Sequence, residues 1–328
     1  SGTPFDVIDL TIYDRKFVSE GYQISGNYDH GLLGIPQQFS FGVRAHRDTA
    51  KRRHKPRSYF MTNSILEFDG VLLSPKTFNR GHSDALSVYL ANEFYFDRLT
   101  LNAGLRLEDI DGEVLNRSTG VTTYNDQKEA MPSVSLLFPL SNNLNLIAGI
   151  HQGFSPSGPG ATGIDPESST NYEFGGRYKD QNTYAELFGF YSDYSNLLGR
   201  CRVSDFGCDP GQVFSGGEVT INGLEVFGEQ TFAISPSTTL RLGLTYTYTK
   251  SEFQSSFLST FSQFGAVKKG DELPYLPEHL AKISAGLSLP NWDFSISVKY
   301  QSEMREEPGQ GPINEGIFAE DYLVTDMN

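Results

Sequence analysis

Long apolar runs are absent from this 328-residue sequence: nowhere do about 18 apolar residues follow one another, so a membrane-spanning helix is not expected. Positive charge is also scarce, with 26 Lys and Arg against 40 Asp and Glu and a net charge of −14. Nucleic-acid binding usually needs a basic surface, so we expect no nucleic-acid partner. Ser1 to Phe5 contain no charged segment followed by an apolar run, and they therefore predict no signal peptide.

Cysteine is nearly absent as well: the two cysteines, Cys201 and Cys208, lie close together in a segment rich in Gly and Asp. They are either two unrelated thiols or the ends of a small disulfide loop. A sequence this poor in cysteine favours the disulfide, which would imply an oxidising compartment. No histidine or further cysteine stands nearby, so a zinc site is disfavoured.

Catalytic signatures are missing too. The six histidines are scattered without H-E-x-x-H spacing, and the sequence has no G-x-S-x-G, P-loop or dinucleotide-binding motif. Asp109 to Glu113 resembles the start of a calcium loop but lacks the rest of its spacing, which favours an ordinary acidic segment. We therefore expect no enzyme, no cofactor and no bound structural metal.

What the sequence does contain is alternation. From Leu99 to Glu108, leucine or alanine fills every second position, and polar residues or glycine fill the others; similar runs are 39–46, 240–249, 281–289 and 292–301. They are roughly ten residues long, which is the length a tilted strand needs to cross a bilayer. Together with 24 Phe, 17 Tyr and 33 Gly, they predict an all-β fold, an antiparallel transmembrane β-barrel. The stretch Tyr184 to Tyr191 carries large residues on both faces, so its outward face stays unassigned.

The predicted connections alternate in length. Short ones fall at 96–98, 141–143, 179–182, 235–237 and 290–291, and long polar ones at 50–84, 112–129, 154–168, 194–218, 251–276 and 303–318. Barrels of the Gram-negative outer membrane have short periplasmic turns and long extracellular loops, whereas a β-sandwich mixes loop lengths at both ends. Aromatic residues gather near the strand ends, as in the interfacial girdles of such barrels. We count thirteen or fourteen strands, from near Asp6 to a strand cut at Asn328.

A basic cluster stands out in this acidic sequence. Arg44, His46 and Arg47 lead into the run Lys51 to Arg57, which holds five further Lys or Arg residues. The cluster is a solvated loop face, a contact for lipopolysaccharide phosphates, or a means of steering an anionic ligand such as a metal–carboxylate chelate. Alternation points Arg44 and His46 to the lumen, which favours the ligand for those two. The candidate anion contacts are Arg44, His46, Arg47, Arg106 and Arg241; Lys282 and Lys299 also lie on polar faces.

Several motifs resemble those of a known family. Ala85 to Phe94 with Leu99 to Glu108 is similar to the central hairpin of TonB-dependent outer-membrane receptors, and Pro166-Glu-Ser-Ser-Thr-Asn-Tyr-Glu173 resembles the strand that follows one of their loops. Gly223-Leu-Glu225 and Leu273 to His279 match the same family. Phe41 to Asp48 and its basic continuation most resemble the branch that takes up ferric dicitrate.

The resemblance implies a barrel of about 22 strands closed by an N-terminal plug, which binds a ferric chelate or siderophore and is driven by the TonB–ExbB–ExbD complex. It also implies a place in the cell outer membrane of a Gram-negative bacterium, beside lipopolysaccharide and outer-membrane lipid. Plug, TonB box and closing strands are not in the sequence. Residues 1–328 are therefore expected to be an incomplete barrel domain, roughly strands seven to twenty, from inside a longer protein.

Three alternatives stay open. Another member of the same family would carry a different siderophore, a cobalamin or a glycan. A passive porin or an assembly barrel would have no energised plug. A structural or adhesive β-protein of the cell surface would fold in water without detergent. The sequence narrows the ligand no further than to an anionic one.

Overall fold

The computed structural model describes residues 6–62, 64–75, 77–200, 213–215, 217–259, 264–313 and 315–328. No helix long and apolar enough to cross a membrane is found among them. Cys201 and Cys208 lie outside the described residues, so their disulfide stays a prediction. Within the described part, nearly all regular structure belongs to one antiparallel sheet of 14 strands.

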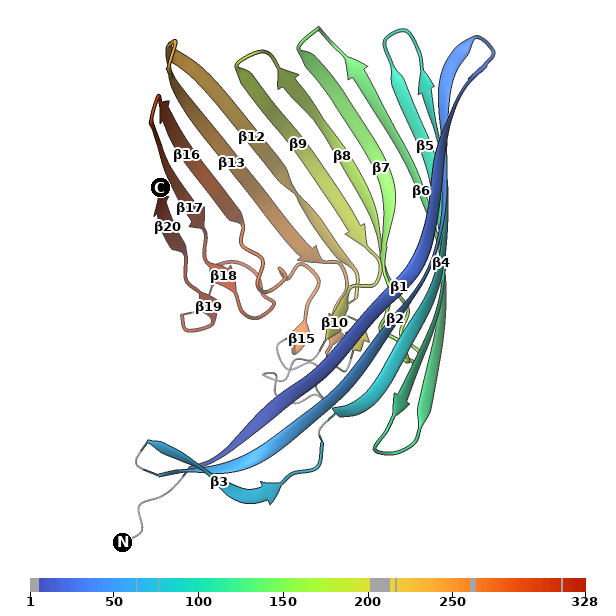
Figure 1. The fold of residues 1–328 in the computed structure, drawn as a ribbon, viewed down its shortest axis with the longest axis vertical. Helices are drawn as coiled ribbons and strands as arrows, with labels where there is room; N and C mark the ends of the chain where they lie inside the picture. Colours follow the sequence, from blue (N-terminus) through green and yellow to red (C-terminus); the bar gives the residue numbers. More distant parts are fainter. Residues whose placement is uncertain are drawn as a thin grey trace.

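Most strands of this sheet pair with their neighbours in the chain (Figure 1). In sheet order they are β1 (Asp6–Leu32), β2 (Ile35–Thr62), β4 (Thr77–Tyr95), β5 (Thr100–Asn116), β6 (Thr122–Pro139), β7 (Leu144–Ser155), β8 (Glu167–Lys179), β9 (Thr183–Tyr194), β12 (Val219–Ser235), β13 (Thr238–Phe253), β16 (His279–Leu289), β17 (Trp292–Gln301) and β20 (Tyr322–Met327). The strand β3 (Ile65–Leu72) pairs with the far end of β2. Because β1 and β20 are unpaired edges, this part of the barrel is curved but not closed.

The two ends of the sheet differ, as the alternating connections predict. One end, at the top of Figure 1, has only tight turns and is called the turn end here. The opposite loop end carries the long connections, which contain three small hairpins: β10 (Leu198–Arg200) with β11 (Val213–Ser215), β14 (Phe257–Leu258) with β15 (Ala266–Val267), and β18 (Met304–Arg305) with β19 (Phe318–Ala319). The predicted all-β antiparallel fold and the number of strands are confirmed.

Two predicted loops are strands instead. The stretch 50–84 is mostly β2, β3 and β4, and 112–129 is a hairpin in which the N–H of Asn116 donates to the carbonyl of Val121 at 2.8 Å. Both stretches are polar, and their polarity predicted loops. A strand that continues beyond the lipid has no need of apolar residues on either face, so its alternation disappears while its hydrogen-bonded ladder continues.

The register confirms the predicted faces. Val43, Val88 and Leu107 are aligned on neighbouring strands and face outward, whereas Arg44, Ser87 and Glu108, one position along, face inward. Large apolar side chains lie uncovered on the outer face, among them Phe174 at 64 % and Trp292 at 67 % exposure. Such a surface fits a bilayer rather than water.

Aromatic pairs mark the turn end. Phe94 and Phe96 stack with ring centroids 6.5 Å apart, and Trp292 and Phe294 stack at 6.2 Å. Rings of this kind suit the interface between lipid and water, where one part of the ring is apolar and another is hydrated. By contrast, the described part has only a small buried apolar cluster, formed by Val219, Phe253 and Val267 at the loop end.

Strand β9, whose faces the sequence left unassigned, turns Phe188 and Phe190 inward and Tyr191 outward. A Cβ placed on Gly175 would lie 2.5 Å from Phe188, and one placed on Gly223 would lie 2.6 Å from Phe190. Each ring therefore lies flat over the glycine of the neighbouring strand, an arrangement that shields the bare backbone of a glycine in a sheet. The large residues on both faces of β9 fit because these inward rings take up little depth.

Candidate functional site

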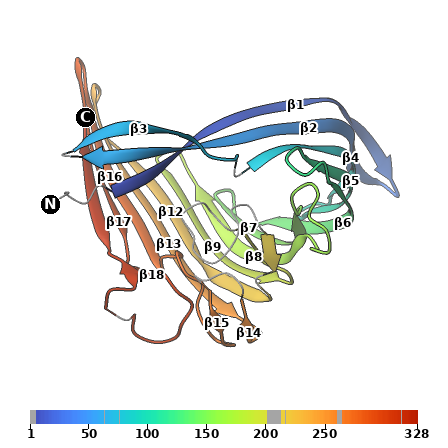
Figure 2. The same ribbon diagram turned by 90° about the horizontal axis from the view of Figure 1, so that it is seen from below.

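The inner face of the curved sheet is polar and forms the candidate site. Seen from the loop end, the sheet bends so that β2, β4 and β5 lie across the interior from β12 and β13 (Figure 2). Four of the five predicted anion contacts face this interior: Arg44 and His46 on β2, Arg106 on β5 and Arg241 on β13. The strand alternation places them there: Arg44, Arg106 and Arg241 each lie between two outward-facing apolar residues, and His46 lies two positions beyond Arg44 on the same face.

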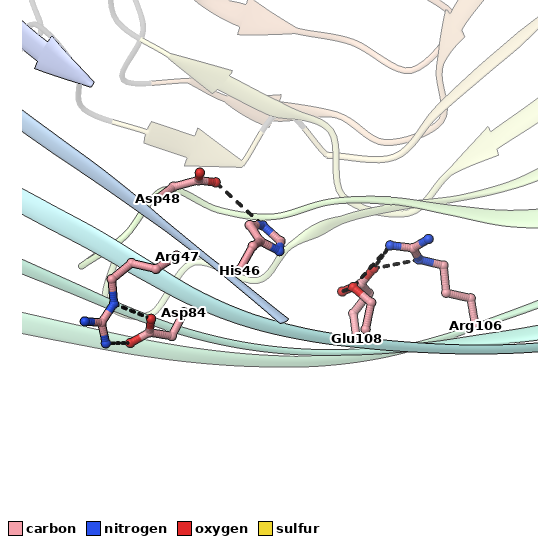
Figure 3. A network of polar contacts seen from close by, with 7 residues as sticks. His46, Arg47, Asp48, Asp84, Arg106 and Glu108 are labelled. Carbon is pink, nitrogen blue, oxygen red and sulfur yellow. Dashed lines mark hydrogen bonds and ion pairs between the residues drawn. The ribbon is translucent and has the colours of Figure 1, made fainter. Parts of the chain in front are cut away.

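Arg106 is held by a compact network on the wall (Figure 3). Its Nε donates to Oε1 of Glu108 at 2.6 Å, and its Nη2 donates to Oγ of Ser87 at 3.2 Å. Ser87 in turn donates to Oε2 of Glu108 at 2.5 Å. The Glu108 side chain is 8 % exposed and that of Arg106 is 45 % exposed, so the carboxylate lies beneath and the guanidinium reaches the interior. Glu108 neutralises much of the Arg106 charge.

Arg44 is the less compensated cation. It is aligned with Ser87 across the β2–β4 pair, so Ser87 lies between Arg44 and Arg106. Arg44 is exposed, and no salt bridge to it is found among the described residues. Beside it, the ring of Tyr89 covers Gly42, where an added Cβ would lie 2.2 Å from Cε1 of the tyrosine. The wall around Arg44 is therefore flat, and the guanidinium is free to meet an anion.

His46 is the next inward-facing residue after Arg44 along β2. Its Nε2 is 3.6 Å from Oδ2 of Asp48, whose side chain also faces the interior (Figure 3). Its Nδ1 is buried and has no hydrogen-bond partner in the described part of the chain. The pair is a polar contact of modest charge rather than a second strong cation, because histidine is charged only when protonated.

Arg47 faces the opposite side of the sheet. In Figure 3 it lies against the ribbons beside Asp84, whereas His46, Arg106 and Glu108 project above the ribbons. Its Nε donates to Oδ1 of Asp84 at 2.6 Å and its Nη2 to Oδ2 at 2.7 Å. The structure therefore does not bring this predicted site residue together with the other four, because neighbours in a strand point to opposite faces.

Arg241 belongs to the far wall. Its Nε is 3.7 Å from Oε1 of Glu229, and both side chains are largely exposed. Other inward-facing cations are paired in the same way: Arg177 with Glu186, and Lys299 with Asp326. These three cations are paired, whereas Arg44 and the inward-facing Lys282 make no salt bridge to a described residue.

A further polar cluster near the loop end escaped the sequence analysis. Nε of Arg15 donates to Nε2 of His54 at 3.1 Å, and its guanidinium lies 4.7 Å from the ring centre of Tyr13. Since Nε2 accepts this bond, His54 carries no proton on that nitrogen. Arg52 is aligned with Arg15 on the same inner face. Only the register of β1 and β2 reveals the cluster, because its members are almost 40 residues apart.

The inner wall offers charge and hydrogen bonds. Within the described ranges, no group of three or more His, Cys, Asp or Glu side chains is placed to hold a metal ion. Guanidinium groups bind carboxylates through paired, charge-assisted hydrogen bonds, so this wall is suited to recognise an anionic ligand.

An apolar outer face, a polar inner face and tight turns opposite long loops together define a transmembrane β-barrel of the outer-membrane type. The family model described as TonB dependent receptor-like, beta-barrel, matches residues 2–328. The chain therefore belongs to the TonB-dependent receptors. Members of this family are receptors and transporters in the outer membrane of Gram-negative bacteria, not enzymes.

Individual relatives are more distant. The chain is 26 % identical over 204 residues to the ferrichrome outer membrane transporter/phage receptor of Escherichia coli K12, an alignment that covers 60 % of this chain and 25 % of that protein. Its fold matches the ferric citrate transporter FecA in its unliganded form, with a TM-score of 0.74, 16 % identity, and coverage of 97 % of this chain and 47 % of FecA. The siderophore receptor PiuA of Acinetobacter baumannii matches with a TM-score of 0.68, 16 % identity, and coverage of 97 % and 49 %.

These comparisons confirm the predicted family. The chain spans a quarter of the ferrichrome transporter and about half of the two solved receptors. At such low identity, the structural matches establish the barrel fold alone.

Proposed function

We propose that this chain forms part of the barrel of an outer-membrane receptor that takes up an anionic ferric chelate by TonB-coupled transport. Ferric citrate is the ligand we favour, because its carboxylates match the fork of an arginine. Family membership favours an energised receptor over a passive porin. In this proposal the loop end faces the outside of the cell and the turn end faces the periplasm.

The observation that carries the proposal is Arg44. It is an exposed guanidinium on the inner wall, without a salt bridge among the described residues, whereas neighbouring Arg106 is neutralised by Glu108. A cation left uncompensated in a polar cavity attracts an anion and holds it when water is partly excluded. The Arg15 and Arg52 pair nearer the loop end extends this positive character along the path of entry.

The iron is cargo in this scheme, held by the chelator rather than by the protein. The proposed partners are the ferric chelate or siderophore, the TonB–ExbB–ExbD complex acting on a plug outside this chain, and the surrounding outer-membrane lipid. The inner wall contributes binding and orientation, while the proton gradient supplies the energy through TonB.

The test compares two arginines three positions apart on one strand. Arg44→Gln removes a cation from the inner wall, and Arg47→Gln removes one from the outer face of the same strand. Uptake of radiolabelled ferric citrate is measured in cells that depend on the receptor, with a neutral hydroxamate chelate as the comparison ligand. Outer-membrane levels of each variant are checked on immunoblots.

We expect Arg44→Gln to weaken ferric citrate binding about tenfold, because one hydrogen-bonded contact to a charged group contributes about 1.5–3 kcal/mol and this group is exposed, which favours the lower value. Arg47→Gln should leave uptake unchanged. Equal uptake by both variants would contradict the role of Arg44. If the unaltered receptor transported the neutral chelate but not ferric citrate, ferric citrate would be wrong as the proposed ligand.

A further inference from the structure

One long connection at the loop end folds back onto the inner face of the sheet. Residues 156–166 join β7 to β8, and the first part of this connection lies against β4, β5 and β6. A turn closes that part, with the N–H of Ala161 donating to the carbonyl of Gly158 at 3.1 Å. Residues 156–161 are called the inner strap here. The proposed anion site does not use them.

Gln127 on β6 holds the inner strap through its side-chain amide. The N–H of Ser157 donates to Oε1 of Gln127 at 3.0 Å, and Nε2 of Gln127 donates to the carbonyl of Ser157 at 3.2 Å. Gln127 is 6 % exposed and Ser157 is 5 % exposed. A buried polar group that loses its partner is costly, so this pair of hydrogen bonds resists opening.

Asn125, two positions before Gln127 on the same face of β6, adds a second attachment. Its Oδ1 accepts from the N–H of Gly160 at 2.5 Å, and its Nδ2 donates to Oγ of Ser157 at 3.4 Å. Gly160 has a φ of 75°, a conformation that glycine adopts readily and that turns this N–H toward the wall. Two backbone N–H groups of the strap are therefore satisfied by side chains of the wall.

Two glycines of the wall make room for the inner strap. A Cβ placed on Gly112 of β5 would lie 2.9 Å from Cα of Pro159, and one placed on Gly81 of β4 would lie 3.5 Å from Cγ of the same proline. Both glycines are buried. A glycine within a strand often marks a place where another backbone approaches closely. Here the backbone that approaches is the strap, whereas the inner-face glycines described above are covered by aromatic rings.

The inner strap lies beside the candidate anion site, on its loop-end side. Gln127 is aligned with Ile110 of β5, which is the next inward-facing residue after Glu108. This step of two residues is about 7 Å at roughly 3.3 Å per residue. With the loop end outside, a ligand that enters the barrel therefore passes the strap before it reaches Arg44 and Arg106.

We propose that the inner strap is a fixed part of the wall rather than a lid, that Gln127 is its positioning residue, and that the strap limits the size of the chelate that reaches Arg44. The proposal rests on the proposed function, because it concerns the same anion site. The strap has no charged residue, so it acts by its bulk and not by attraction. Two of its six residues are proline, whose fixed φ stiffens the backbone.

The first test is amide hydrogen exchange in the complete receptor, without ligand and with saturating ferric citrate. Gln127→Met keeps the length of the side chain but removes both of its hydrogen bonds to the strap. Gly112→Ala displaces Pro159 through a different contact. The matched controls are Gln152→Met, at an exposed glutamine on β7, and Gly149→Ala, whose added Cβ would meet no atom closer than 3.6 Å.

We expect the amides of Ser157 and Gly160 to exchange at least tenfold faster in the two strap variants, and within twofold of the unaltered receptor in the two controls. In the unaltered receptor, ferric citrate should change their exchange by less than twofold. A larger slowing with ligand would overturn the proposal, because the strap would then be a lid that closes. Equal exchange in all variants would also overturn it, because the wall would not be what holds the strap.

The second test compares two anionic ferric chelates of different size, ferric citrate and a macrocyclic ferric tris-catecholate, by isothermal titration calorimetry. Release of the strap should raise the affinity for the larger chelate relative to ferric citrate at least tenfold, and the controls should change this ratio by less than twofold. An unchanged ratio despite faster exchange would overturn the limit on size. If the unaltered receptor bound neither chelate, the proposed function would fail, and the exchange without ligand would still decide whether the wall holds the strap.

Discussion

Substitutions of Glu108 and Arg106 should both lower the stability of the barrel, but they should change ligand binding in opposite directions. Glu108→Gln keeps the size of the side chain and one acceptor but removes the negative charge beneath the guanidinium. Arg106→Gln removes the cation and leaves a carboxylate that is 8 % exposed with Ser87 as its remaining donor. Both changes damage the same network, but they move the charge of the inner wall in opposite senses.

The expected cost in unfolding free energy follows from burial. Breaking a fully buried ion pair by removing one partner costs about 3–5 kcal/mol, and the Arg106 side chain is 45 % exposed, so screening lowers the value. We expect about 2 kcal/mol for Arg106→Gln, which strands the buried charge, and about 1 kcal/mol for Glu108→Gln, which does not. The double variant should cost less than the two single changes added together.

Two assays measure these quantities. Unfolding of the receptor in detergent is followed by the mobility of the folded barrel on gels across a denaturant series, and ferric citrate binding is followed by isothermal titration calorimetry. Glu108→Gln should tighten binding because Arg106 is no longer neutralised, and Arg106→Gln should weaken it. Additive costs in the double variant, or a change of binding in the same direction for both, would refute the assigned network.

Two further outcomes are expected. Gly42→Ala should lower the free energy of unfolding by about 1–3 kcal/mol, because its Cβ would lie 2.2 Å from the Tyr89 ring. Gly228→Ala should not lower it, because no atom lies within 4 Å of the added Cβ. Denaturant midpoints of the two variants test this, and equal midpoints would contradict the packing of Tyr89 over Gly42. In the β8–β9 turn, hydrogen bonds led by the backbone N–H of Asn182 hold the pKa of Asp180 below its usual 3.8. Its folded pKa is depressed, so this stabilisation is complete above about pH 4 and is lost as the pH falls through the folded value. Asp180→Ala should therefore lower the unfolding midpoint at pH 7 but not at pH 2, and a loss of the same size at both pH values would exclude the carboxylate.

The strands that cross the apolar region could be predicted from the sequence. Leu99 to Glu108 has one lipid face and one polar face, and this physical requirement leaves a period of two in the sequence. Beyond the lipid, that requirement ends. The outer parts of β2 and β5 therefore have no regular apolar face, and only their hydrogen-bonded partners identify them as strands.

The candidate site was predictable in part for the same reason. Arg44 and His46 were placed in the lumen by alternation, and the structure agrees. Arg47 was grouped with them by proximity in sequence, although the same alternation sends it to the outer face and into contact with Asp84. The neutralisation of Arg106 could not be predicted, because it depends on the alignment of β4 with β5.

The inward-facing rings that cover glycines lie close to the inner face of the sheet. Tyr89 over Gly42, Phe188 over Gly175 and Phe190 over Gly223 lie against the wall instead of projecting from it. A bulky residue at any of these glycines would push its ring toward the axis and narrow the bore. The pairing of aromatic residues with glycine thus lets the curved sheet carry rings on its inner face without filling the space that the sheet partly encloses.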